Sequence, residues 1–174
     1  YVIRPMITYR ALELDASAST IGYLAAIYAL FPVLLALVFG KLVGRIGEGK
    51  FVIAGTFFIG VSSALLLVPH SLILLFIAAA LSGLAHLACM VGGQTMVALR
   101  SPTDKYEEYF GRYTFSASLG QMLGPILATL VAGSTGVIPR STSAAFALAL
   151  ALSAIAIVPV FSWRRDTPTV IAEK

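Results

Sequence analysis

Residues 16–40 read ASASTIGYLAAIYALFPVLLALVFG, and no residue in this stretch carries a charge. Other apolar, uncharged stretches lie between the following pairs of charged residues: Lys50 and Arg100, Arg112 and Arg140, and Arg140 and Arg164. A helix needs roughly 20 apolar residues to cross a hydrocarbon layer about 30 Å thick. Because lipid offers no hydrogen bonds to the backbone, such segments span as helices. The sequence therefore predicts an all-α, polytopic transmembrane helical bundle.

Five spans are expected, because Pro69-His70-Ser71 interrupts the long stretch after Lys50. Their expected bounds are about 18–40, 51–68, 72–99, 113–132 and 143–163. The third is longer than a bilayer requires, so we expect it to tilt, to kink near Gly92-Gly93 or to protrude. The composition agrees, with 59% hydrophobic and 11% charged residues, against roughly 25% charged residues in soluble domains.

The orientation is predicted from the Lys and Arg residues that flank the spans. Nine lie on one side: Lys41, Arg45, Lys50, Arg100, Lys105, Arg112, Arg164, Arg165 and Lys174. Three lie on the other side: Arg4, Arg10 and Arg140. The positive-inside rule places these nine residues, Lys174 among them, in the cytoplasm. Basic residues in short loops between spans favour this interpretation over nucleic-acid binding.

The segment between the first two expected spans reads GKLVGRIGEGK (residues 40–50). It resembles the Gly-x-x-x-Asp-Arg-x-Gly-Arg/Lys signature of the major facilitator superfamily, which lies in the cytoplasm between the second and third helices. Gly40, Arg45 and Gly47 fit this pattern. Gly44 stands where the family usually has Asp, and Glu48 where it usually has a basic residue. The resemblance implies that this loop latches the two halves of a transporter through charge pairs.

A second motif lies in the fourth span, where residues 120–125 read GQMLGP. It resembles the Gly-x-x-x-Gly-Pro-x-x-Gly-Gly signature of exporters in the same superfamily, with Ala128-Thr129 in place of the last two glycines. Gly120 and Gly124 allow a neighbouring helix to approach closely, and Pro125 is expected to bend the helix. Ordinary packing of small residues remains the alternative.

The resemblance covers essentially the whole chain and implies a domain organisation. Residues 1–174 would form a partial N-terminal transmembrane domain, in which the five spans correspond to helices 2–6 of a six-helix half. Tyr1–Ile7 would be the exit end of helix 1 on the outside. The partners are then the rest of helix 1, the C-terminal half of the same protein, the bilayer of the inner (plasma) membrane and a small-molecule substrate.

His86 is the one ionisable side chain within the expected spans, where such residues are costly and often functional. Gln94 follows two turns later, and Gln121 lies inside the second motif. These three are the candidate cavity residues, with helix packing as the alternative for each. Tyr23 and Tyr28 are interpreted as packing or interfacial residues.

Two functions remain open. The favoured one is a secondary active transporter that exports small amphipathic molecules by alternating access, as an efflux antiporter. The alternative is a membrane scaffold or accessory subunit without transport. An enzyme is not expected, because the sequence has no zinc-protease, Gly-x-Ser-x-Gly or paired-Asp motif. No cofactor or metal is expected either: Gly44–Lys50 resembles a phosphate loop, but Phe51 replaces its Ser/Thr.

Overall fold

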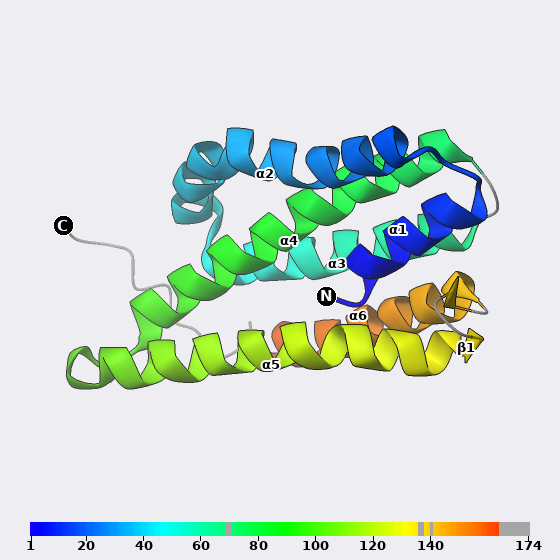
Figure 1. Cartoon of the computed structure of the whole chain (residues 1–174). Coiled ribbons are helices and arrows are strands. Elements are labelled where there is room, and N and C mark those ends of the chain that lie inside the picture. Colours follow the sequence, from blue (N-terminus) through cyan, green and yellow to red (C-terminus); the bar gives the residue numbers. More distant parts are fainter. Residues whose placement is uncertain (69–70, 136–137, 140, 164–174) are drawn as a thin grey trace.

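The computed structural model describes residues 1–68, 71–135, 138–139 and 141–163. The described elements are, in chain order, α1 (Ile3–Glu13), α2 (Ala18–Ile46), α3 (Glu48–Leu67), α4 (Leu72–Arg100), a 3-10 helix (Thr103–Lys105), α5 (Tyr106–Ala132), β1 (Ser134–Thr135), β2 (Ile138–Pro139) and α6 (Thr142–Trp163). The predicted all-α class is confirmed (Figure 1).

Four segments of the described chain are long and apolar enough to cross a membrane: α2, α3, α4 and Thr103–Ala132. A fifth, shorter apolar helix covers Thr142–Val158. Large apolar side chains point away from the bundle on these helices; Leu37 in α2 is 81% exposed and Leu130 in α5 is 71% exposed. Such surfaces suit lipid or further helices.

The connection between α2 and α3 differs from the expected loop of residues 40–50. α2 continues as a helix to Ile46, so Gly40 and Arg45 are helical, and Gly47 alone separates it from α3. The extension is held by packing, because Val43 is buried against Phe51. Gly47 has a φ of +95°, which glycine adopts without strain, and its N–H donates to the carbonyl oxygen of Val43 at 2.9 Å.

Two other expectations are also corrected. The N-terminal helix does not end near Ile7: α1 runs to Glu13, and Asp15 with a φ of +53° lies in the turn before α2. Residues 106–112, which precede the fourth expected span of about 113–132, form the first turns of α5 instead. There Tyr106 stacks against Phe110, and Arg112 pairs with Glu108 one turn away.

The break at Pro69-His70-Ser71 falls between α3 and α4, and Pro69 and His70 lie outside the described residues. α4 runs obliquely to α5 in Figure 1 and is helical throughout, including Gly92-Gly93. Tilt or protrusion of this long span in the membrane stays a prediction. The connection between α5 and α6 contains an unexpected short hairpin, in which Ser134 pairs with Pro139 and Thr135 with Ile138.

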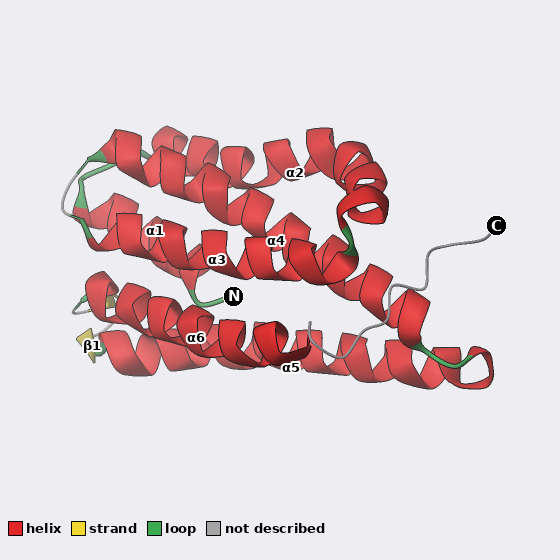
Figure 2. Ribbon diagram, turned by 180° about the vertical axis from the view of Figure 1, so that it is seen from behind, coloured by secondary structure: helices red, strands yellow, loops and turns green. Residues whose placement is uncertain are grey.

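The helices form two groups, α2–α3–α4 and α5–α6, which are joined by the contact of α3 with α6 and by α1. α3 packs between α4 and α6, α2 lies along α4, and α5 lies along α6. α1 contacts α2, α4, α5 and α6, and both views show it between α4 and the α5–α6 pair (Figures 1 and 2). The short α1 therefore occupies the centre of the described bundle.

Small residues determine where the helices cross. A Cβ on Gly83 of α4 would overlap the carbonyl oxygen of Tyr28 in α2. On Gly55 of α3, a Cβ would lie 2.6 Å from the Sγ of Cys89 in α4. Such sites let backbones approach closely, which is how membrane helices gain packing energy. A buried hydroxyl pair adds to the α3–α4 contact: Ser62 donates to the carbonyl oxygen of Ala78, and its Oγ lies 2.6 Å from that of Ser82.

Candidate functional site

His86 and Gln121 are brought together through Tyr1. The ring of Tyr1 meets His86 of α4 edge-on, with centroids 5.1 Å apart and an interplanar angle of 75°. Nε2 of Gln121 in α5 donates to the hydroxyl of Tyr1 at 3.0 Å. Two of the three candidate cavity residues thus share one neighbour, although they are 35 positions apart in the sequence.

Arg4 and Tyr28 extend this group onto two further helices. The guanidinium of Arg4 in α1 lies over the ring of Tyr28 in α2, 5.3 Å from its centroid. Arg4 is exposed and Tyr28 half-buried, so the pair lies at the surface of the bundle. We call Tyr1, Arg4, Tyr28, His86 and Gln121 the α1 cluster.

Gln94 does not belong to the α1 cluster. It is exposed on α4, two turns beyond His86 and so about 12 Å further along the axis. None of the described hydrogen bonds involves its side chain. Tyr23 is 67% exposed on α2, and the expectation that it faces an interface stays a prediction.

The Gly120–Gly124 face of α5 packs against the start of the chain. A Cβ on Gly124 would lie 3.0 Å from the Cβ of Tyr1 and 3.3 Å from the backbone nitrogen of Val2. At Gly120 the nearest atom would be Cδ2 of Tyr1, at 3.9 Å. Gly124 is therefore the tighter of the two contacts. α5 remains helical through Pro125, and the role of this motif in bending stays a prediction.

The expected latch residues lie at the opposite end of the bundle from Glu13. Lys41 and Arg45 are exposed. The sequence motif lacks its usual Asp, but Glu48 forms an ion pair with Arg100 at the end of α4. Nη2 of Arg100 lies 2.7 Å, and Nε 3.2 Å, from Oε1 of Glu48. This pair holds the start of α3 against the end of α4.

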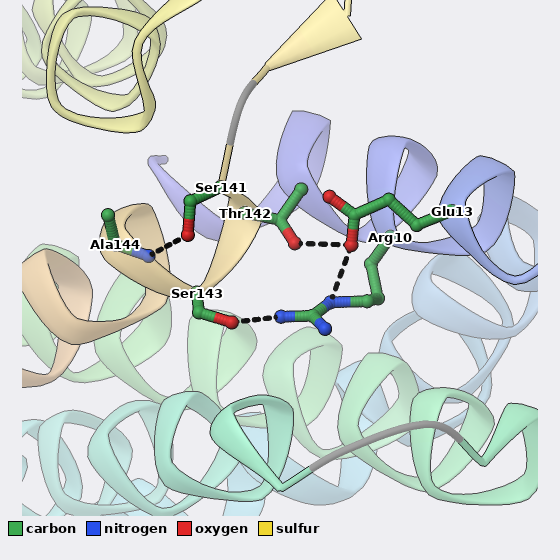
Figure 3. Close-up of polar contacts among 6 residues, drawn as sticks. All are labelled: Arg10, Glu13, Ser141, Thr142, Ser143 and Ala144. Carbon is green, nitrogen blue, oxygen red and sulfur yellow. Dashed lines mark hydrogen bonds and ion pairs between the residues drawn. The ribbon is translucent and has the colours of Figure 1, made fainter.

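A second polar network connects α1 with α6 (Figure 3). Nη2 of Arg10 donates to Oγ of Ser143 at 2.6 Å, and Nε of Arg10 lies 3.3 Å from Oε2 of Glu13. The hydroxyl of Thr142 donates to the same carboxylate oxygen at 2.8 Å. Arg10 is 7% exposed and also covers the ring of Phe146. A buried guanidinium is thus matched by a carboxylate, a hydroxyl and an aromatic face.

Sequence reasoning did not identify Arg4, Tyr28 or Tyr1 as members of a site. Arg4 carried a signal, because an arginine within a helix of a membrane protein is unusual and often functional. The two tyrosines carried none, since aromatic residues are common in membrane helices. Their proximity depends on helix crossings that no local pattern specifies.

The described helices have the architecture of a multi-pass membrane protein. A family model described as Major Facilitator Superfamily matches residues 1–174, and the chain belongs to this superfamily of transporters, which are not enzymes. It is also 27% identical over 143 residues to Multidrug resistance protein 1 of Bacillus subtilis (strain 168). The match covers 82% of the chain and 37% of that relative, so the chain spans well under half of the relative's length.

Proposed function

We propose that this chain belongs to the N-terminal half of a secondary transporter that exports small amphipathic molecules. Family membership supports transport, and the name of the Bacillus subtilis relative, a multidrug resistance protein, supports export of drug-like compounds. The central observation is the α1 cluster, where residues of four segments meet on an exposed face. Polar groups at such a position suit a substrate path between two halves of a transporter.

The second half is proposed to pack onto this same face. α2 and α5, which carry Tyr28 and Gln121 of the α1 cluster, also expose apolar side chains, among them Leu30, Phe31, Leu123 and Leu127. The relative is long enough to contain a second half. Alternating access would then proceed by rocking of the two halves about the site. The scaffold alternative predicts the same packing without flux.

The function is tested by dye accumulation in cells that express the full-length protein. Two amphipathic dyes are used, the anionic carboxyfluorescein and the cationic ethidium. Expressing cells should accumulate less of at least one of them than cells with empty vector, and a protonophore should abolish the difference if export is coupled to protons as an antiporter. Equal accumulation of both dyes in both strains, with the protein present in the membrane, would contradict export. A difference that persists with the protonophore would exclude proton coupling while leaving export in place.

We also propose that the end of the bundle with Glu48 and Arg100 faces the cytoplasm of a plasma or inner membrane, on the strength of the Lys and Arg asymmetry. Single cysteines at Ser141 and Thr103 test it in a Cys89→Ala background. An impermeant maleimide should label position 141, and not position 103, in intact cells. The reverse labelling pattern would invert the topology.

A further inference from the structure

The α1 cluster lies near the middle of the helices. Arg4 precedes the end of α1 by nine residues, or about 14 Å of helix. Tyr28 lies ten residues, about 15 Å, from the start of α2 at the same end of the bundle. His86 is fourteen residues from either end of α4. Since hydrocarbon is about 30 Å thick, these side chains lie close to the mid-depth of the membrane.

Arg4 brings a positive charge to this depth without a carboxylate beside it. Among the described residues, no ion pair involves Arg4; its guanidinium lies over the ring of Tyr28. The carboxylates of the described chain all lie at helix ends or in connections: Glu13, Asp15, Glu48, Asp104, Glu107 and Glu108. Arg10, the other arginine of α1, has Glu13 as its partner. An uncompensated guanidinium near mid-depth is costly and points to a ligand.

The neighbours of Arg4 specify what kind of ligand fits. Gln121 and His86 add groups that donate hydrogen bonds, and Tyr1, Tyr28 and His86 add aromatic surfaces. A planar guanidinium binds a carboxylate through two parallel hydrogen bonds. A cationic ligand would meet Arg4 without any described carboxylate to offset the repulsion.

We propose that the α1 cluster binds amphipathic anions, with Arg4 contacting a carboxylate and with Tyr1 and Tyr28 contacting an aromatic body. This rests on the proposed transport function and names the substrate class of that same site. Arg4 is the specificity-determining residue, because it alone distinguishes an acid from a neutral molecule of the same shape.

The test compares three molecules that share one ring system: 1-naphthaleneacetate, 1-naphthaleneacetamide and 1-naphthylmethylamine. Equilibrium dialysis measures their binding to the purified full-length protein. The acid should bind at least about fivefold more tightly than the amide, and the amine most weakly. Equal affinities of acid and amide, or no binding of the acid, overturn the proposal. Either result is also expected if a carboxylate from the second half of the protein already pairs with Arg4.

Variants of Arg4 test whether this residue is responsible for the preference for the acid over the amide. Arg4→Gln should lower the affinity for the acid by about fivefold or more and leave that for the amide within about twofold. Arg4→Lys should retain only part of the preference, because the charge remains but the two parallel hydrogen bonds of the guanidinium are lost. Arg112→Gln, on the exposed first turns of α5, is the matched control and should change neither affinity. An unchanged preference in a folded Arg4→Gln protein overturns the proposal, and the wild-type comparison stands if that variant does not fold.

Uptake into proteoliposomes separates this proposal from the proposed function. Transport of the amide and amine without binding of the acid would refute the anion site and leave the transporter in place. Binding of the acid to wild type, lost in Arg4→Gln, without movement of any of the three molecules would support the anion site and refute transport.

Discussion

Arg10 in α1 donates a hydrogen bond of 2.6 Å to Ser143 in α6, across 133 positions of the sequence. This contact joins the first and last helices of the described bundle, and Thr142 repeats the connection through Glu13. The central helix is thus fixed at one end by polar bonds, whereas small residues pack around it elsewhere.

Arg10→Met should destabilise the protein. It removes the bond to Ser143 and leaves Glu13 without its cation, for a cost of about 1–3 kcal/mol. The apparent melting temperature of the full-length protein in detergent should fall, and Ser143→Ala should lower it less. Arg112→Gln serves as the control, because its pair with Glu108 is exposed. A melting temperature of Arg10→Met equal to wild type would show that this network adds no stability.

Gly83→Ala should separate α2 from α4. The added Cβ would overlap the carbonyl oxygen of Tyr28, which is backbone and has nowhere to move without shifting a helix. We expect a loss of monodisperse protein, measured by fluorescence-detected size exclusion. Gly22→Ala is the matched control in α2, since its Cβ would meet nothing within 4 Å. Equal behaviour of the two variants would refute the close crossing at Gly83.

Gly124→Leu should reduce transport strongly while insertion into the membrane stays intact. The larger side chain would displace Tyr1 and Val2, which a Cβ alone already approaches to 3.0–3.3 Å, and with them the ring that contacts His86. Dye export per molecule of membrane protein is the measurement. Gly111→Leu, where a Cβ meets nothing within 4 Å, is the control on the same helix. Wild-type export by Gly124→Leu would show that the motif serves helix packing only and that this packing tolerates a larger side chain.

The ion pair of Glu48 and Arg100 should contribute only about 0.5–1 kcal/mol to the free energy of unfolding, because both side chains are partly exposed, at 18% and 30%. Its effect should therefore appear in transport rate rather than in folding. Glu48→Gln and Arg100→Gln should each alter the rate, and the double variant should alter it no more than the larger single change. Additive effects in this double-mutant cycle would show that the two residues act independently.

His86→Gln should flatten the pH dependence of transport between about pH 5.5 and 7.5, around the ordinary His pKa of about 6.5. The charged groups around His86 are the amino terminus at Tyr1 and the guanidinium of Arg4, and the phenols of Tyr1 and of Tyr28 in α2 are the titratable groups beside them. Protonation adds a further positive charge beside Arg4, so an anion should bind better as the pH falls. The His86→Gln variant should not show this increase in anion binding as the pH falls. Superimposable pH profiles would make His86 a packing residue.

The helical class was predictable because a charge is costly to place in hydrocarbon and the backbone must satisfy its own hydrogen bonds there, so long uncharged, apolar stretches indicate helices. Helix ends were less predictable. α2 passes Gly40 because Val43 packs on Phe51, a contact between helices that charge patterning does not report. The α1 cluster was only half foreseen: His86 and Gln121 were marked by their polarity, whereas Arg4 and Tyr28 join them through the crossing at Gly83 and the central place of α1.

The single-residue turn at Gly47 has a mechanical consequence. A connection of one residue cannot lengthen to absorb movement, so a displacement at the end of α2 should also displace the start of α3. From there it reaches α4 through the tight contact of Gly92 with Phe51 and through the pair of Glu48 with Arg100. We therefore expect α2, α3 and α4 to move together at this end of the bundle, so that a displacement of the end of α2 is passed along α4 toward His86.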